Sequence, residues 1–159
     1  MSGPISGKAE RFFADTNLLL YALDRTAPAK RKQAATWLDW LWTTGAGRLS
    51  WQVLHEFYWN AVRKMGVPVA DARAAVQAFA LWQPLEATLG LVQRAWAFSD
   101  RAGLAYWDAL IVAAAERSGA SYLLSEDLPA GQSFGSVMVL DPFRCDPSEY
   151  VAHPGSKRG

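Results

Sequence analysis

The sequence predicts a three-layer α/β/α domain built on a small central, mainly parallel sheet of four or five strands. Three observations support this prediction. Short apolar segments alternate along the chain with longer segments of helical periodicity, an order typical of parallel sheets covered by helices. Glycine and proline residues separate these segments. At 159 residues, 51% of them hydrophobic, the chain is long and apolar enough for one domain with a substantial core.

The first predicted strand covers about residues 11–15, where apolar residues run into a polar turn and a short helix that ends near Leu23. Pro28 begins a longer helix, because proline suits a first helical turn and apolar residues then recur every three or four positions up to Gly45. The later elements are bounded in the same way by glycine or proline, and they are a strand at 48–51, helices at 52–64, 69–82, 88–101 and 106–118, a loop at 126–135, and strands at 121–125 and 136–140.

We expect one domain over residues 11–143, with a flexible leader at 1–10 and a flexible tail at 144–159, because both ends are rich in small and polar residues. The longest uninterrupted apolar run, Ala109 to Ala115, is far shorter than the roughly 18 residues of a membrane span. The first ten residues also lack the apolar core of a signal peptide. These observations predict a soluble, cytoplasmic protein without a membrane partner.

Charge and cysteine content exclude several classes of site. A net charge of +1 argues against a protein that coats nucleic acid nonspecifically. The single cysteine, Cys145, excludes an internal disulfide, and His55 and His153 add too few ligands for a zinc site of imidazole and thiolate. A metal would therefore be held by carboxylates, whose oxygen atoms suit magnesium or manganese.

Three aspartates occupy positions at which a polar site can form. Asp15 and Asp127 each follow an apolar strand, and in an open α/β sheet ligands bind at the carboxyl ends of strands. Asp108 lies at the start of the most apolar helix. Each also has a purely structural interpretation: Asp15 as a helix N-cap, Asp127 as a turn residue, and Asp108 as an acid that favours the helix N-terminus.

Glu56 is harder to explain structurally. It lies in an aromatic-rich helix, and Val53 and Trp59 are expected on the same side of that helix. A carboxylate on an inward face is costly unless it is paired or bound to a metal, and no Lys or Arg lies three or four residues away. Four carboxylates in one cleft would repel each other, and a divalent cation would relieve that repulsion.

These segments resemble the PIN domain family of small metal-dependent ribonucleases, and most closely the VapC-type toxins of bacterial toxin–antitoxin pairs. The similarity spans about residues 11–143. One short motif alone would be weak evidence, whereas four acids in this order, each in its local context, are specific. The segments that carry the resemblance are Phe13-Ala14-Asp15-Thr16-Asn17, Leu54-His55-Glu56-Phe57, Trp107-Asp108-Ala109-Leu110, Leu123-Leu124-Ser125-Glu126-Asp127-Leu128 and Val139-Leu140-Asp141-Pro142-Phe143.

The resemblance implies an endoribonuclease toxin with a catalytic pocket that is formed by Asp15, Glu56, Asp108 and Asp127. Mg²⁺ or Mn²⁺, bound by Asp15, Asp108 and Asp127, would activate a water for attack on an RNA phosphodiester. Thr16, Asn17 and Ser125 would orient the carboxylates through hydrogen bonds. Asp127 matches the fourth acid of the family better than Glu126, although a contribution from Glu126 stays open. The resemblance further implies a homodimer and a cognate antitoxin.

Other interpretations are a non-catalytic PIN-like module that binds RNA or protein, a phosphoacceptor receiver domain, and a phosphatase of the Asp-x-Asp type. The complete set of four acids argues against the first. A receiver domain needs a lysine late in its chain, and no lysine lies between Lys64 and Lys157. The phosphatase needs a second aspartate where Asn17 stands. The eight tryptophans fit either a core or a surface that binds a partner.

Overall fold

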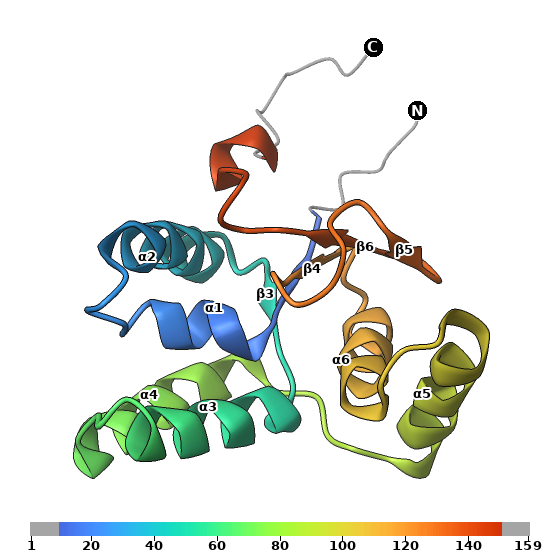
Figure 1. Cartoon of the computed structure of the whole chain (residues 1–159), viewed down its shortest axis with the longest axis horizontal. Coiled ribbons are helices and arrows are strands. Elements are labelled where there is room, and N and C mark those ends of the chain that lie inside the picture. Colours follow the sequence, from blue (N-terminus) through green and yellow to red (C-terminus); the bar gives the residue numbers. More distant parts are fainter. Residues whose placement is uncertain (1–9, 151–159) are drawn as a thin grey trace.

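A computed structural model of the chain describes residues 10–150, and its centre is a five-stranded sheet (Figure 1). The strand order is β3-β2-β4-β6-β5, and all neighbouring pairs are parallel except β5 with β6. This arrangement confirms the predicted fold class. The strands are β2 (Phe12–Ala14), β3 (Gly47–Arg48), β4 (Tyr122–Leu124), β5 (Ser133–Phe134) and β6 (Val137–Leu140).

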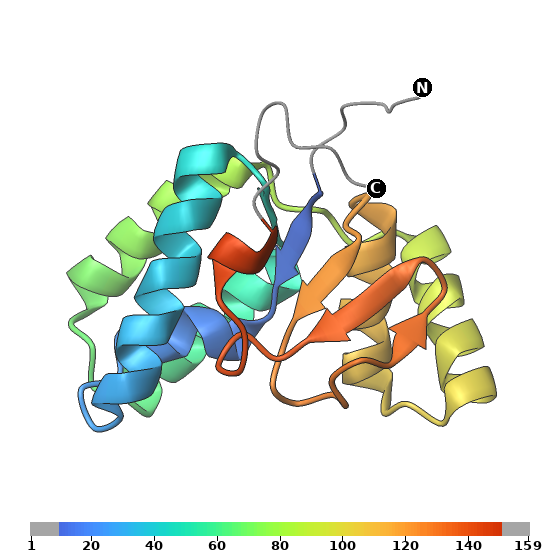
Figure 2. The ribbon, with the colours of Figure 1, turned by 90° about the horizontal axis from the view of Figure 1, so that it is seen from above.

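Helices cover both faces of the sheet. Helix α6 contacts β4 and β6 and carries α5 on its outer side, whereas α2 and the short turn η2 lie on the opposite face (Figure 2). Helices α1, α3 and α4 pack on one another beside the β2–β3 edge (Figure 1). The bounds are α1 (Thr16–Tyr21), α2 (Pro28–Thr44), α3 (Trp51–Arg63), α4 (Val69–Phe79), η1 (Ala80–Trp82), α5 (Leu89–Ala102), α6 (Tyr106–Arg117) and η2 (Pro147–Tyr150).

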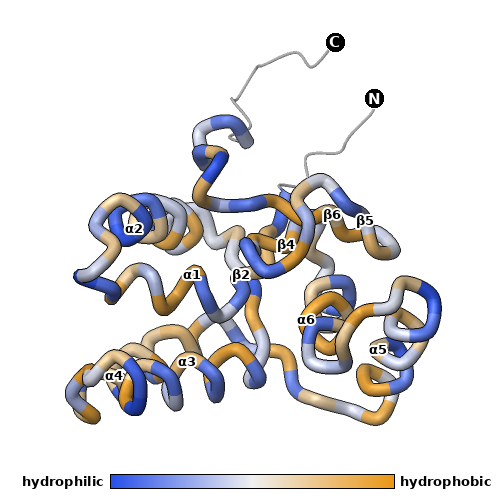
Figure 3. Tube along the Cα trace, in the orientation of Figure 1, coloured by the Kyte–Doolittle hydropathy of each residue, from blue (hydrophilic) through white to orange (hydrophobic). Residues whose placement is uncertain are grey.

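The core lies between the sheet and these helices. All three residues of β2 are fully buried, as expected for a central parallel strand with helices on both faces. The seven apolar residues of α6 from Ala109 to Ala115 are also buried, and Figure 3 shows hydrophobic residues along α6 and the strands. These residues hold the carboxyl end of β2 and the start of α6 in fixed positions.

Two predicted elements near the sheet edges need correction. The strand predicted at 48–51 is only Gly47–Arg48, because the Ser50 hydroxyl accepts a hydrogen bond from the Val53 amide and thereby begins α3 at Trp51. The predicted loop at 126–135 contains β5, which forms a hairpin with β6. Its turn includes Gly135 at φ +59°, a conformation that glycine adopts without strain.

The packed domain also extends beyond the predicted boundary at residue 143. In η2, the ring of Tyr150 lies 5.7 Å from that of Phe12 and 5.3 Å from that of Tyr122. The indole Nε1 of Trp37 donates to the carbonyl of Cys145 at 3.0 Å. Residues 144–150 are therefore part of the core packing rather than of a flexible tail, whereas 1–9 and 151–159, to which the leader and tail predictions also apply, lie outside the described residues.

Within residues 10–150, each helix is too short or too polar to cross a bilayer.

Candidate active site

The carboxyl ends of β2 and β4 place Asp15 beside Ser125. The two strands are parallel neighbours, and the backbone ladder continues past them, since the Asp15 amide donates to the Leu124 carbonyl at 3.1 Å. The Ser125 hydroxyl then donates to Asp15 Oδ2 at 2.7 Å. Two segments that are 110 residues apart thus meet at one edge of the sheet.

Asp15 is both a helix cap and a buried acid. Its backbone is extended, and its Oδ1 accepts from the Thr16 amide at 2.7 Å, which confirms the capping interpretation. Only 7% of the residue is exposed. The pKa of Asp15 is raised to about 6, mainly by burial and further by the charges of Asp127 and Glu56, against the opposing effect of the hydrogen bonds from Ser125 and Thr16. A helix cap can function at the protein surface, so the capping role alone does not explain why Asp15 is buried close to other acids.

Glu56 reaches the same edge from α3. Its Oε1 accepts from the Thr16 hydroxyl at 2.7 Å, and its Oε2 accepts from Gln52 Nε2 at 3.2 Å. No lysine or arginine of the described chain pairs with it. The expected inward face is only partly observed: Val53 is buried and Glu56 half-buried, but Trp59 is 58% exposed because it lies on the outer side of α3.

Asp108 and Asp127 come from the start of α6 and from the loop after β4. Asp108 lies in the first turn of α6 and is half-buried; burial, followed by the charges of Asp127 and Glu56, raises its pKa. Asp127 is exposed, and its Oδ2 accepts from Asn17 Nδ2 at 3.0 Å. The Asp127 amide donates to the Ser125 hydroxyl at 3.1 Å, so Ser125 connects the loop after β4 to Asp15.

The four acids therefore share one electrostatic environment, and their donor atoms fit a hard divalent cation. Asn17 adds a buried Oδ1 that has no hydrogen-bond donor in the described structure. Within residues 10–150, no three carboxylate, imidazole or thiolate groups come close enough to form a complete cage for a metal. Magnesium is compatible with this open arrangement, because it usually takes one or two carboxylates and completes its shell with water and substrate phosphate.

The sequence reasoning missed Gln52, Lys30 and the backbone of Trp107. Gln52 precedes Glu56 by one helical turn, a spacing that could have indicated their hydrogen bond, and it also donates to the Trp107 carbonyl at 3.4 Å. Lys30 Nζ lies 2.7 Å from Glu126 Oε2, over the ring of Tyr21. Glu126 is thus turned toward α2, and no local pattern could have indicated a partner 96 residues away.

We expect the substitution Ser125→Ala to raise the pKa of Asp15, because the Ser125 hydrogen bond lowers it. Carboxyl NMR signals recorded against pH would show Asp15 titrating at a higher pH than in the wild type. Ser118→Ala is a suitable control, since Ser118 donates to the Ala115 carbonyl at the end of α6 opposite to Asp108. An unchanged Asp15 titration in Ser125→Ala would show that the hydroxyl does not tune this carboxylate.

Comparison with protein families matches residues 12–128 to the PIN domain. This match covers most of the chain, including the strand that precedes Asp15 and the loop that contains Asp127. Comparison with curated proteins returned no similar sequence. Together with the five-stranded sheet and the carboxylates at its edge, the family match shows that the chain belongs to the PIN domain family.

Proposed function

We propose that this protein is a metal-dependent endoribonuclease. The observation that supports this proposal most directly is the buried Asp15 carboxylate, whose pKa is raised by burial and by Asp127 and Glu56. Placing like charges around a buried acid costs stability, and a divalent cation would relieve that cost. Membership of the PIN family supports a nuclease-like activity for the same site.

In this proposal the residues have distinct roles. Asp15, Asp108 and Asp127 would supply the carboxylate oxygens for Mg²⁺ or Mn²⁺, one or two of them directly and the rest through bound water, because no three acids of residues 10–150 lie close enough to form a complete cage. When bound, the metal would supply an acidified water and polarise the scissile phosphate. Glu56, fixed by Thr16 and Gln52, would orient the attacking water from the α3 side. The hydrogen bond from Ser125 would restrict the Asp15 side chain to one rotamer, and the hydrogen bond from Asn17 would do the same for Asp127. Both carboxylates would then be oriented before the metal binds.

The biological setting is proposed from the resemblance to VapC toxins: a cytoplasmic, homodimeric toxin controlled by an antitoxin. A cleft of about 490 Å³ beside Glu56 supports the proposal that an antitoxin binds near the acids. The cleft is mostly apolar, and Trp107 in its lining is 64% exposed. An amphipathic peptide or helix could bury its apolar face there and so block the acids. The cleft is lined mainly by Trp51, Leu85, Leu91, Trp107 and Leu110.

The central test is cleavage of total cellular RNA by purified, antitoxin-free protein with Mg²⁺ or Mn²⁺, and then with EDTA. We expect cleavage only with metal and its loss in Asp108→Asn, because that change removes a charged oxygen ligand. Asp100→Asn, which alters an exposed acid on α5, should cut like the wild type. Cleavage that persists in EDTA or in Asp108→Asn would contradict a metal nuclease at this site.

The second candidate is a PIN-like module that binds RNA or protein without cutting. The exposed Asp127 and the absence of a complete three-ligand cage among residues 10–150 are the observations in its favour. Calorimetry with MnCl₂ separates the two candidates. The nuclease predicts saturable Mn²⁺ binding that Asp108→Asn weakens, whereas the binding module predicts no saturable binding and intact RNA.

A further inference from the structure

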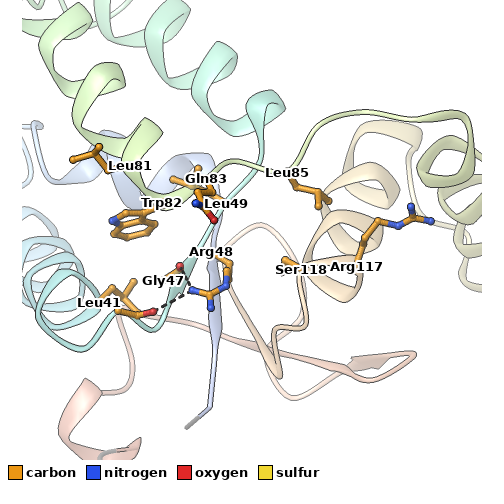
Figure 4. A pocket seen from close by; sticks show the side chains of 11 residues that line it. Leu41, Gly47, Arg48, Leu49, Leu81, Trp82, Gln83, Leu85, Arg117 and Ser118 are labelled. Carbon is orange, nitrogen blue, oxygen red and sulfur yellow. Dashed lines mark hydrogen bonds between the residues drawn. The ribbon is translucent and has the colours of Figure 1, made fainter. Parts of the chain in front are cut away.

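A second cavity, of about 460 Å³, lies beside β3 at the edge of the sheet (Figure 4). It includes the last residue of α6, Arg117, whereas Asp108 lies in the first turn of the same helix. Nine residues separate the two positions, or about 14 Å along a helix. The cavity is therefore distinct from the acidic site. Its lining residues are Leu41, Gly45, Gly47, Arg48, Leu49, Leu81, Trp82, Gln83, Leu85, Arg117 and Ser118.

Arg48 is a partly buried cation without a counter-ion in the described chain. Its Nη1 donates to the carbonyls of Gly45 at 3.1 Å and Gly47 at 2.7 Å, which fixes the guanidinium plane. Among residues 10–150 no carboxylate forms an ion pair with it, and the remaining N–H groups of its fork have no protein acceptor. Burial lowers the pKa of Arg48, and the nearby charge of Arg11 lowers it further. A bound anion would relieve both effects.

Polar and aromatic side chains complete the cavity around Arg48. Figure 4 shows Gln83 beside Leu49 and Trp82, and Ser118 on the α6 side of Arg48. Gln83 has φ 56°, and it is the only non-glycine residue in the described chain with a positive φ. Gln83 is the residue that ends η1, a position at which the left-handed conformation is common, and the same conformation also occurs at ligand sites. The ring of Trp82 packs so closely over Gly47 that any Cβ at position 47 would overlap it.

The lining contains two arginines and no acid. Arg117 contributes charge rather than a direct contact, because its guanidinium is directed away from Arg48 and lies close to Gly90 of α5 (Figure 4). A rigid guanidinium fork binds phosphate oxygens in two parallel hydrogen bonds. The cavity is larger than a free phosphate requires and falls in the size range of small-molecule sites.

We propose that this cavity binds the phosphate group of a nucleotide, with Arg48 as its main contact and Trp82 and Gln83 beside the base. Arg48 donates its free N–H groups to the phosphate oxygens, and the Gln83 amide supplies a further polar contact. The Ser118 hydroxyl already donates to the Ala115 carbonyl at 2.7 Å, so it lines the cavity without donating to the phosphate. The inference goes beyond the proposed nuclease activity and does not depend on it, because it uses none of the four acids.

The test is an NMR titration of the ¹⁵N-labelled full chain in EDTA, with inorganic phosphate in one arm and uridine 5′-monophosphate in the other. We expect saturable shifts of the Arg48 Nε–H and Trp82 indole signals. Arg48→Gln should weaken binding of either probe by at least about tenfold, the effect of losing a charged hydrogen bond. Arg101→Gln, an exposed arginine on α5, is the matched control and should bind like the wild type.

Gln83→Gly is the second variant, because glycine accepts the positive φ and the fold is retained while the amide is lost. It should weaken the nucleotide more than inorganic phosphate. Equal binding of both probes to the wild type would assign the site to phosphate alone, and tighter binding of the nucleotide would assign the base contact as well. No saturable binding of either probe, or wild-type binding by Arg48→Gln, would overturn the proposal. EDTA removes divalent metal, so neither result depends on whether the protein cuts RNA.

Discussion

The substitution Asp15→Asn is expected to abolish metal-dependent cleavage while it stabilises the metal-free protein. Loss of activity follows from the proposed role of Asp15 as a metal ligand, and we expect a decrease of at least about a hundredfold. Stabilisation follows from burial, because an amide carries no charge to desolvate. A variant that loses its activity by misfolding would lose stability instead, so the two effects together identify a functional acid.

The pH dependence of this effect has a definite sign. The pKa of Asp15 rises from 3.8 to about 6 on folding, so between these values the folded state binds more protons than the unfolded state. The free energy of unfolding therefore decreases as the pH rises from about 4 to 6, because buried Asp15 must ionise in the folded protein. Above pH 6 this ionisation lowers the free energy of unfolding by about 3 kcal/mol. Asp15→Asn lacks this loss, and its advantage over the wild type should grow across the same pH range.

Urea unfolding of both proteins in EDTA at pH 4 and pH 7 measures this difference. Asp100→Asn provides the control, because it removes the charge of an exposed acid in α5 rather than of a buried one. Adding Mg²⁺ or Mn²⁺ at pH 7 should then stabilise the wild type and leave Asp15→Asn unchanged, since a ligand stabilises only the state that binds it. Equal stability of the two proteins at pH 7 in EDTA would show that the charge of Asp15 does not destabilise the folded protein.

Trp37→Ala is expected to cause the largest loss of stability. Trp37 is fully buried, and its ring lies 5.6 Å from that of Phe12 and 6.2 Å from that of Tyr150. Removing a buried tryptophan typically costs about 3–5 kcal/mol, a large fraction of the total stability of a small domain. Because the ring joins α2, β2 and η2, the variant should also lose the ordered packing of residues 144–150.

Two further variants separate the ring from its hydrogen bonds. Trp37→Phe removes the indole N–H but keeps most of the ring, and Gln33 Nε2 still donates to the Pro142 and Cys145 carbonyls. We therefore expect Trp37→Phe to cost only about 1–2 kcal/mol. Trp96→Ala, at a residue that is 51% exposed, should cost less than about 1 kcal/mol. Urea unfolding midpoints give this order, and equal costs for Trp37→Ala and Trp96→Ala would contradict the core assignment.

Local sequence patterns determined the fold class and the positions of the acids along the chain. Apolar runs, glycine and proline indicate individual helices and strands. These were placed to within a few residues except at the sheet edges and at the end of the helix predicted at 69–82, where Ala80–Trp82 form the 3-10 turn η1. The predictions for the edge strands differ from the structure because pairing with a neighbouring strand decides which residues form an edge strand. Gly47–Arg48 is a strand through its register with Phe12 and Phe13, and Ser133–Phe134 is one through pairing with β6.

Only the tertiary structure decided what surrounds each acid. The Thr16 hydroxyl meets Glu56 across 40 residues, and the Ser125 hydroxyl meets Asp15 across 110. Such contacts depend on strand order and helix packing, which no local spacing encodes. The same holds for the burial that raises the pKa of Asp15 and for the cavity at Arg48, whose partly buried guanidinium has no acid beside it in the described chain. Residue types and their order follow from the sequence, whereas distance, burial and charge environment exist only once the chain is folded.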